Sequence, residues 1–399
     1  VLFRSLVTRH SSLLKSVLFN ARFLLSHQME GIGWFSFEVI RRIAAAHREV
    51  RFVYAFDRAF DERFLTSDNI EPVVLRPPAR HPFLFWLFFE WALPRLVARR
   101  QFDAFFSPDG FLSLRVKVPT LLTIHDLAYA HFPNQVGWLA QKYYERYMPM
   151  FAHRAERIAA VSSFTKADIV QRLGVAADKI DVVYNGCNEA YRPLSEADKM
   201  AARARWSGGE AYFIYVGSIH PRKNVARILR AFEQFKTQTA GAERMRLLLV
   251  GRMAWQTGEV GEVLAQMRHR EAVVLLGYVD MADLPQLVGA AMASVYASLF
   301  EGFGVPILEA MRAGVPVICS DSSSMPEVAG GAGLLVNPQS VDSIAAAMQQ
   351  VFCDAPLREK MQREGLASSE RFGWDLTAQK VWSSLERCLS EGKTAAGEK

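Results

Sequence analysis

The chain has 399 residues and a mass of 44.9 kDa, which is too long for one compact core and suits two domains of ordinary size. Half of the residues are apolar, 22% are charged, and 25 Gly and 17 Pro are few for this length, so the composition excludes a disordered, collagen-like or disulfide-stapled chain. The excess positive charge lies in the first half, because residues 1–195 carry 25 Lys and Arg against 18 Asp and Glu, whereas residues 196–399 carry 22 against 23. A basic half suits nucleic acid, anionic lipid or a phosphorylated substrate, and charge alone does not choose among them.

The first 15 residues are basic and Ser-rich and contain no acidic residue. They lack the apolar core and the small-residue cleavage site of a secretory signal peptide, and they match either a transit peptide or a start-site artefact. We therefore treat residues 1–15 as an extension outside the fold.

From residue 16 onward, short apolar runs alternate with longer amphipathic segments. Each run is followed within two residues by Gly, Asn, Asp or Ser, which is typical of buried parallel strands. Segments such as 224–237 and 340–352 have helical spacing, and this alternation, repeated twice, predicts an α/β fold with two doubly wound domains. The predicted strands are 16–19, 51–56, 103–106, 120–124, 157–161 and 180–183 in the first half, and 212–216, 246–250, 272–276, 294–297 and 315–319 in the second.

The most polar and least patterned stretch, residues 191–210, predicts the domain junction. We therefore expect an N-terminal domain over residues 16–195, a C-terminal domain over residues 205–385 and a flexible tail over residues 390–399. Ligands of doubly wound sheets bind beyond the carboxyl ends of the strands, so site residues are expected just after these strands.

The longest apolar stretch is PFLFWLFFEWALPRLVA, residues 82–98. It is interrupted by Glu90, Pro94 and Arg95, and a bilayer-spanning helix needs about 20 apolar residues, so no transmembrane segment is expected. Aromatic residues beside arginines suit a helix that lies in a membrane interface, and a buried helix with a basic end is an equal alternative.

Several kinds of site have no signal in the sequence. Cys187, Cys319, Cys353 and Cys388 are far apart and form no CxxC pair, which argues against a zinc site and favours a reducing compartment such as the cytosol. There is no GxxxxGK[ST] loop, no GxSxG elbow and no Asp-x-Asp after a strand, so neither P-loop phosphoryl transfer nor a metal-held diphosphate is indicated. Neither aromatic-basic interleaving nor a helix-turn-helix pattern points to nucleic acid.

The strongest chemical signal is YASLFEGFGVPILEAMRAG at residues 296–314. A strand ends there in a Gly-rich loop and a helix begins near Pro306, so free backbone N–H groups and the positive helix end form an anion site. Glu301 and Glu309 flank this site, and because a carboxylate repels phosphate, we expect them to accept hydrogen bonds from sugar hydroxyls. The structural alternative is that Glu301 caps the loop and Glu309 only complements the helix dipole.

A second signal is YVGSIHPRKN at residues 215–224. Arg222 and Lys223 stand just before a predicted helix, where the helix dipole disfavours cations, and this indicates an anionic ligand between them and the helix. The guanidinium of Arg can donate two parallel hydrogen bonds to phosphate oxygens, and the ammonium of Lys acts as a point charge. An ordinary surface pair of cations is the alternative.

The first half carries weaker signals. Glu30-Gly31-Ile32-Gly33 precedes a predicted helix, which is weak evidence of phosphate binding because tight turns explain many such patterns. His125 directly follows a predicted strand and is well placed for a cleft. Ser162, Ser163 and Thr165 follow another strand, and we expect them to cap the next helix rather than to act in catalysis.

These motifs together resemble the retaining GT-B glycosyltransferases of family 4, also called group 1. The resemblance runs from about residue 212 to 374 through GSIHPRKN, LLGYVDMADLPQLVGAA, YASLFEGFGVPILEAMRAGVPVICSD, SSSMPEVAGGAGLLVNP and RFGW. In the first half, NARFL, EGIG, TIHDL and AVSSFTKADI are similar to the same family with looser motifs. The resemblance implies a GT-B fold, in which two Rossmann-like domains face each other across a cleft, the second holding a nucleotide sugar and the first holding the acceptor.

The resemblance also implies roles for individual residues. Arg222 and Lys223 match the positions that neutralise the donor diphosphate. Glu301 matches the residue that contacts the donor sugar, and Glu309 matches the one that holds the ribose hydroxyls. The other matches are Gly33 in the first-domain loop over the diphosphate, His125 at the face of the donor sugar, Tyr278 in the wall near the nucleobase, and Gly302, Phe303 and Gly304 as the backbone beside sugar and phosphate.

Two positions depart from the family pattern. Trp34 stands where many relatives carry Arg or Lys, which puts in doubt a cationic acceptor contact at this position. Ala297 stands where relatives usually have Pro, and we expect little consequence.

The activity implied is a retaining, metal-independent transfer of a hexose from a nucleotide sugar to a glycan or lipid-diphosphate-linked glycan acceptor in surface polysaccharide synthesis. HPRKN with EGFGxPxLEAM recurs in members resembling O-antigen and exopolysaccharide mannosyltransferases, so GDP-mannose is the expected donor, with UDP-sugars or dTDP-rhamnose as alternatives. No cofactor, metal or nucleic acid is expected as a partner. A sugar-nucleotide 2-epimerase of related fold and a catalytically silent scaffold are the competing interpretations.

The excess positive charge of the first half then lies in the domain that is expected to hold the acceptor. An anionic membrane surface is the partner that the basic first half favours, through the aromatic run 83–91 and the group Arg95, Arg99 and Arg100. We therefore expect a cytoplasmic enzyme that associates peripherally with the inner face of the plasma membrane.

Overall fold

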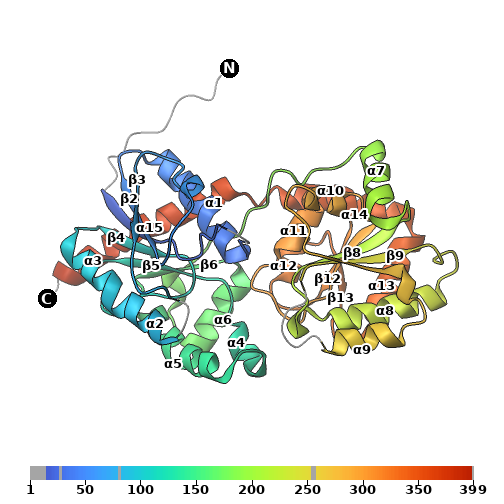
Figure 1. Ribbon diagram of the computed structural model, residues 1–399, viewed down its shortest axis with the longest axis horizontal. Coiled ribbons are helices and arrows are strands. Elements are labelled where there is room, and N and C mark those ends of the chain that lie inside the picture. The colour runs from blue at the N-terminus through green and yellow to red at the C-terminus, as the bar shows by residue number, and fades with distance from the viewer. Residues whose placement is uncertain (1–14, 27–28, 80–81, 253–257, 398–399) are drawn as a thin grey trace, which may run out of the picture.

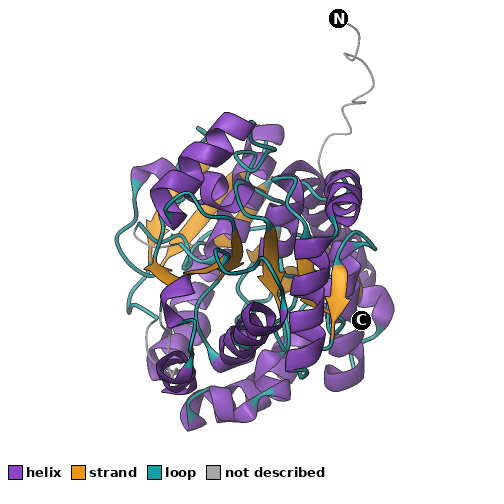
Figure 2. Cartoon of the chain, turned by 90° about the vertical axis from the view of Figure 1, so that its right-hand side faces the viewer, coloured by secondary structure: helices purple, strands orange, loops and turns teal. Residues whose placement is uncertain are grey.

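The computed structural model describes residues 15–26, 29–79, 82–252 and 258–397, with side chains as far as Ser390. Two α/β domains lie side by side, each built around one parallel sheet (Figure 1). Seen from the end of the second domain, helices lie on both sides of the strands (Figure 2). The architecture confirms the predicted fold class of two doubly wound domains. The expected extension over residues 1–15 lies outside the described residues except for Lys15.

The first sheet has seven parallel strands in the order β3-β2-β1-β4-β5-β6-β7. Successive residues of each strand face opposite sides of the sheet, so Val17 and Phe19 pack in one core and Leu18 packs in another. The strands are β1 (Ser16–Asn20), β2 (Arg51–Phe56), β3 (Ile70–Val74), β4 (Ala104–Ser107), β5 (Thr120–Ile124), β6 (Arg157–Ala160) and β7 (Ile180–Val182).

The second sheet has six parallel strands in the order β10-β9-β8-β11-β12-β13. Its topology repeats that of the first sheet, with the strand order reversing direction between β8 and β11 as it does between β1 and β4. Such switch points are where doubly wound sheets bind ligands. The strands are β8 (Tyr212–Val216), β9 (Arg246–Val250), β10 (Val273–Gly277), β11 (Ala293–Tyr296), β12 (Val317–Ser320) and β13 (Leu334–Val336).

The helices connect successive strands and cover both faces of each sheet. Those from the first half are α1 (Gly31–Ala46), α2 (Pro82–Leu87), the π-helical η2 (Phe88–Ala92), α3 (Leu93–Arg99), α4 (Ala128–His131), α5 (Trp138–Arg154) and α6 (Ser163–Leu173). Those from the second half are α7 (Glu196–Ser207), α8 (Val225–Gln238), α9 (Gly258–Gln266), α10 (Leu284–Gly289), α11 (Val305–Arg312), α12 (Met325–Ala329), α13 (Val341–Cys353), α14 (Ala355–Ser369) and α15 (Trp374–Gly397). Single 3₁₀ turns are η1 (Glu62–Phe64), η3 (Pro133–Gln135), η4 (Ala177–Lys179), η5 (Pro221–Lys223) and η6 (Arg270–Ala272).

All eleven predicted strands are present within two residues of their predicted ends, but two further strands were missed. β3 and β13 are edge strands of their sheets. β3 contains Pro72, which an edge strand tolerates because it lacks a neighbour on one side. β13 has only three residues, and one of them, Leu335, is 45% exposed. These two edge strands were missed because one contains a proline and the other is very short.

The predicted domain boundaries need two corrections. Residues 196–207 form α7, so the polar stretch taken as a junction is largely a surface helix that Ser195 caps by accepting a hydrogen bond from the backbone N–H of Asp198. α15 packs on α1 and on strands of the first sheet, so the chain returns to the first domain from Trp374 onward (Figure 1). The helix continues to Gly397, where we had expected a flexible tail.

The apolar stretch 82–98 forms one continuous helical rod through α2, η2 and α3. The π turn lets the backbone N–H of Leu93 donate to the carbonyl of Phe88, just before Pro94, which has no N–H to donate. Phe88 and Phe89 are buried, so one face of the rod is core. Among the described helices, none combines the length and apolar character that crossing a bilayer requires.

Candidate active site in the interdomain cleft

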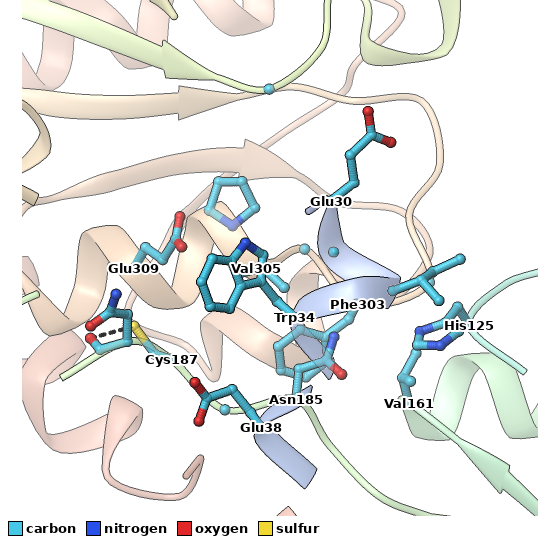
Figure 3. Close-up of a pocket in the computed structure, with 18 of the residues that line it drawn as sticks. Glu30, Trp34, Glu38, His125, Val161, Asn185, Cys187, Phe303, Val305 and Glu309 are labelled. Carbon is cyan, nitrogen blue, oxygen red and sulfur yellow. Dashed lines mark hydrogen bonds between the residues drawn. The ribbon is translucent and has the colours of Figure 1, made fainter. Parts of the chain in front are cut away.

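A cleft of about 620 Å³ lies between the two domains, at the carboxyl ends of both sheets (Figure 3). The first domain contributes the start of α1 and the loops after β5, β6 and β7, and the second contributes the loops after β8 and β11. This is the place that the strand pattern predicted. Its walls include Gly31, Ile32, Trp34, His125, Asp126, Asn185, Cys187, Gly217, Ser218, Lys223, Tyr296, Glu301, Gly302, Phe303, Gly304, Glu309 and Trp374.

Two half-buried cations and one buried carboxylate form a cluster in the second domain. Lys223 Nζ lies 2.7 Å from Glu301 Oε1, and Arg222 Nη1 lies 3.3 Å from Glu301 Oε2. Lys223 also donates to the hydroxyl of Tyr296 at 2.9 Å, and Ser298 Oγ donates to Glu301 Oε1 at 2.6 Å. The cluster carries a net charge of one positive unit, so it suits an anionic ligand.

The charges of the cluster tune one another. Burial by itself would raise the pKa of the Glu301 carboxyl, but Lys223 and Arg222 outweigh it and lower the pKa to about 2. Burial lowers the pKa of Lys223, although Glu301 opposes this shift. Glu301 therefore stays ionised at any ordinary pH, and as a weakly basic carboxylate it suits accepting hydrogen bonds better than taking protons.

The loop after β11 is held by serine hydroxyls that follow β12. Ser323 Oγ accepts from the backbone N–H of Glu301 at 3.1 Å, and Ser324 Oγ donates to the carbonyl of Glu301 at 2.9 Å. Within the described structure, the backbone N–H groups of residues 302–305 donate to no protein atom. They lead into the N-terminus of α11, so the anion site predicted from this motif has its donors available.

Glu309 lies in α11 and points into the cleft (Figure 3). Burial raises the pKa of its carboxyl to about 7. The buried hydroxyl of Tyr191 lies beside this carboxyl and opposes the effect of burial on its pKa. Unlike Glu301, this carboxylate forms no ion pair with any cation of the described residues, so it is ready to accept hydrogen bonds from ligand hydroxyls.

His125 lies on the opposite wall, in the loop after β5 (Figure 3). Its Nε2 lies 2.8 Å from the carbonyl of Pro108, which can only accept, so Nε2 carries the proton and Nδ1 is the acceptor. Burial lowers the pKa of the ring, with the Pro108 carbonyl acting in the opposite direction. The ring packs edge-on against Phe35 at 5.0 Å, so the imidazole is neutral and fixed in orientation.

Three of the predicted site residues do not line the cleft. Gly33 lies within the first turn of α1 rather than in a loop before it, and a Cβ there would come within 2.7 Å of the Phe23 carbonyl, so this glycine serves close packing. Tyr278 is 59% exposed outside the cleft walls. Arg222 reaches the site through Glu301, and its guanidinium donates to the carbonyl of Phe300.

Other residues of the site were not predicted. Trp34 points into the cleft, and the buried Asn185 presents there an Oδ1 atom that accepts no hydrogen bond from the described residues (Figure 3). Tyr296, Ser298 and Ser323 support the cation cluster. The serine run after β12 could have indicated hydroxyl groups that hold the neighbouring loop. Asn185 lies in the linker between the domains, where no local sequence pattern indicates a site residue.

Among the described residues, no group of three or more His, Cys, Asp and Glu side chains is arranged to hold a metal ion. The charged side chains that line the cleft are Lys223, Glu301 and Glu309 of the second domain and, from the first half of the chain, Glu30, Glu38, Arg41, Arg42, Asp126 and Glu189.

Comparison with known families gives two matches that together cover most of the chain. The family described as "Glycosyl transferases group 1" matches residues 196–367, and "Glycosyltransferase Family 4" matches residues 29–191. An "O-antigen chain mannosyltransferase B" of Escherichia coli is 31% identical over 370 residues, which cover 88% of this chain and 94% of the relative. The Salmonella typhimurium "O-antigen chain mannosyltransferase RfbU" is 25% identical over 291 residues, covering 72% and 76%.

Solved structures show the same fold at lower sequence identity. Anabaena HepE, in complex with UDP and glucose, has a TM-score of 0.72 at 19% identity and covers 93% of this chain and 99% of that one. WaaG, a glycosyltransferase involved in lipopolysaccharide biosynthesis, has a TM-score of 0.70 at 15% identity with the same coverage. The fold therefore agrees with the GT-B architecture that the sequence motifs implied.

Proposed function

Because the chain belongs to glycosyltransferase family 4 and has the GT-B fold, we propose that it transfers mannose from GDP-mannose to a glycan or lipid-linked glycan with retention of anomeric configuration. That it is a glycosyltransferase follows from the family. The donor, the stereochemistry and the acceptor are our proposal, and surface polysaccharide synthesis is the process in which we place it.

The observation that carries the proposal is the pairing of Lys223 and Arg222 with Glu301 beside the free N–H groups of the α11 loop. A departing nucleoside diphosphate gains negative charge as the sugar leaves. Fixed cations and N–H groups aimed at that charge lower the barrier without reorganising in the reaction. Lys223 lines the cleft directly, and Arg222 adds its charge from behind Glu301.

Glu301 suits an orienting role rather than a nucleophilic one. Its oxygens accept hydrogen bonds from Lys223 and Ser298, and its pKa of about 2 makes it a poor base. Because Glu301 is so weakly basic, retention fits attack from the face that the diphosphate leaves, with the leaving phosphate taking the proton of the acceptor hydroxyl. Glu301 then holds sugar hydroxyls in the reactive position.

Three further contacts complete the proposed donor site. Nδ1 of His125 accepts a hydrogen bond from a sugar hydroxyl, since its Nε2 is occupied by the Pro108 carbonyl. Glu309 accepts from the ribose hydroxyls, which donate and therefore favour its ionised form. The diphosphate lies against the backbone of residues 302–304. In this proposal no metal takes part, because Lys223, Arg222 and the backbone N–H groups beside the diphosphate supply the positive charge.

The donor proposal is supported by the two relatives described above, both of which are named mannosyltransferases. HepE was solved with UDP and glucose, which keeps UDP-sugars as the competing donors to test. Thermal unfolding with GDP, UDP and dTDP at equal concentration separates the bases, because a ligand that binds the folded state raises the unfolding temperature. Incubation with GDP-mannose, with and without glycan acceptors, followed by NMR of the anomeric proton, then tests transfer and retention. A larger shift with UDP and no product from GDP-mannose would refute the donor.

We place the acceptor at an anionic membrane surface on the α2–η2–α3 rod, which makes the enzyme cytoplasmic and peripheral. The face opposite the buried Phe88 is exposed at Phe83 (63%), Trp86 (42%) and Trp91 (45%). The guanidinium carbon of the exposed Arg95 lies 3.5 Å from the centre of the Trp91 ring, which joins the cation to the aromatic surface.

Sedimentation with vesicles of neutral or mixed neutral and anionic lipid tests this placement. We expect binding that requires anionic lipid, is lost in Arg95→Glu/Arg99→Glu and is kept in Arg268→Glu, an exposed charge on the second domain. Arg100 is left unchanged because it pairs with Glu71. Equal sedimentation of the wild type and both variants would refute the placement. So would a wild type that does not sediment with anionic vesicles.

A further inference from the structure

Three contacts from the second domain converge on the N-terminus of α6 in the first domain. They come from Phe300 and Gly302, on either side of Glu301, and from Glu327 of α12. All three residues are far in sequence from α6, and each contacts a different group at the start of that helix. The loop that carries Glu301 is therefore attached to the opposite domain on both of its sides.

Glu327 caps the helix across the interface. Its Oε1 accepts from the backbone N–H of Ser163 at 2.9 Å and from the hydroxyl of Tyr184 at 2.8 Å, and its Oε2 accepts from the backbone N–H of Phe164 at 3.1 Å. The first N–H groups of a helix have no partner within the helix, and a carboxylate both satisfies them and complements the helix dipole. Charged acceptors make such bonds stronger than neutral ones.

The carbonyl of Gly302 is held by two buried hydroxyls of the first domain. Ser162 Oγ donates to it at 2.6 Å and Thr165 Oγ1 donates at 3.1 Å. A Cβ at position 302 would lie 1.8 Å from the carbonyl oxygen of His125, so the two backbones are in direct contact. Ser162 therefore does more than the capping we predicted, although it also accepts from the N–H of Thr165.

Phe300 fills an aromatic pocket of the first domain. Its ring centre lies 4.3 Å from that of His131 and 5.6 Å from that of Phe164, and the side chain is 4% exposed. Because Phe300 and Gly302 are both fixed to the first domain, the backbone of Glu301 between them has little freedom relative to His125.

We propose that the start of α6 is a docking point that positions the 300–302 loop, with Thr165 and Glu327 as positioning residues for Glu301. Only when the domains meet here does the carboxylate of Glu301 take its place opposite His125. Glu327 and Thr165 touch no substrate in this arrangement; they act through the loop. The proposal rests on the proposed role of Glu301 in orienting the donor sugar.

The test compares Glu327→Gln, Glu327→Asp and Thr165→Val with Glu359→Gln, which changes an exposed carboxylate of α14. We expect Glu327→Gln and Thr165→Val to lower turnover about 10-fold or more while the affinity for the nucleoside diphosphate changes less than about 2-fold. Glu327→Asp should recover part of the loss and Glu359→Gln should behave like the wild type. Unchanged turnover, or a loss that follows diphosphate affinity and unfolding temperature, would overturn the proposal.

Hydrogen exchange with the diphosphate bound keeps this test separate from the identity of the donor. The amides of Ser163 and Phe164 should exchange faster in Glu327→Gln than in the wild type, because their acceptor is weakened. If wild-type protein fails to use GDP-mannose but shows this difference, the donor proposal fails and the docking point stands. If the exchange is unchanged, the docking proposal is wrong whatever the donor.

Discussion

The ammonium nitrogen of Lys223 lies 2.7 Å from a carboxylate oxygen of Glu301 in the cleft between the domains, where Glu301 is buried and Lys223 is half-buried. Seventy-eight residues separate them in the sequence, and they meet because β8 and β11 are neighbours in the second sheet. Each residue follows its strand, at the switch point of the sheet. In the proposed function, the pair joins a cation that binds phosphate to a carboxylate that orients the sugar, so changes at the two residues test the two roles separately.

Replacement of Lys223 by alanine should weaken donor binding and slow transfer. The change removes a half-buried cation from the proposed diphosphate site and leaves Glu301 with Arg222 alone, so the remaining cluster is neutral rather than positive. We expect a loss of about 10-fold or more in diphosphate affinity, measured by calorimetry, together with lower turnover. Lys360→Ala, an exposed lysine of α14, is the control. Wild-type affinity in Lys223→Ala would contradict the assignment.

Glu301→Gln should lower turnover by about 100-fold or more, because the amide cannot accept sugar hydroxyls as a carboxylate does. Diphosphate affinity should stay the same or rise, since Lys223 is released to the ligand. Steady-state kinetics and diphosphate titration measure the two effects separately. A variant that keeps the wild-type rate would remove Glu301 from the mechanism.

Glu309 should make diphosphate binding and stability depend on pH near neutrality. Its pKa is raised to about 7, so the stability present below the unfolded-state pKa of about 4.5 is lost as pH rises toward 7. Ribose hydroxyls donate to the ionised form, so affinity should increase over the same range and binding should release a proton. Glu309→Gln should therefore be more stable than the wild type above pH 7 and bind nucleoside diphosphate more weakly.

Thermal unfolding and calorimetry between pH 5 and 8 check both effects of Glu309 in the wild type and in Glu309→Gln. The diphosphate itself also titrates, but it does so equally in both proteins and cancels in the comparison. The pH profile of the variant should be flatter than that of the wild type. Parallel profiles would show that another group titrates.

Gly302→Ala should abolish most activity without unfolding the protein. A Cβ at this position would lie 1.8 Å from the carbonyl oxygen of His125, so the two domains must move apart. We expect turnover to fall about 100-fold or more, with the separate domains still folded in circular dichroism. Gly137→Ala, where a Cβ meets no atom within 4 Å, is the matched control. Near-normal turnover in Gly302→Ala would mean that the contact with His125 is not needed.

Transfer should withstand removal of divalent metal. Lys223, Arg222 and the N–H groups of the α11 loop supply the positive charge that a metal ion would otherwise bring to the diphosphate. Turnover after treatment with EDTA should stay within about 2-fold of the untreated enzyme. Loss of activity that Mg²⁺ or Mn²⁺ restores would contradict metal independence.

The second domain was the more predictable of the two. Arg222, Lys223, Glu301 and Glu309 all follow from local motifs, because each stands next to a strand end or helix start that the sequence marks. The first domain was harder. Gly33 was assigned to a ligand loop, yet it lies inside α1, since a glycine in a helix start looks the same in sequence whether it meets a ligand or packs on a neighbour.

The sequence by itself determined the two doubly wound domains and the loop and helix start proposed as the anion site of the second one, because hydrophobic periodicity and the chemistry of a loop before a helix are local properties. Only the tertiary structure decided how the domains meet. The return of α15 to the first sheet, the cap that Glu327 places on α6 and the contact of Gly302 with His125 each join residues distant in the sequence. Such contacts depend on how whole domains pack together, and no local sequence pattern carries that information.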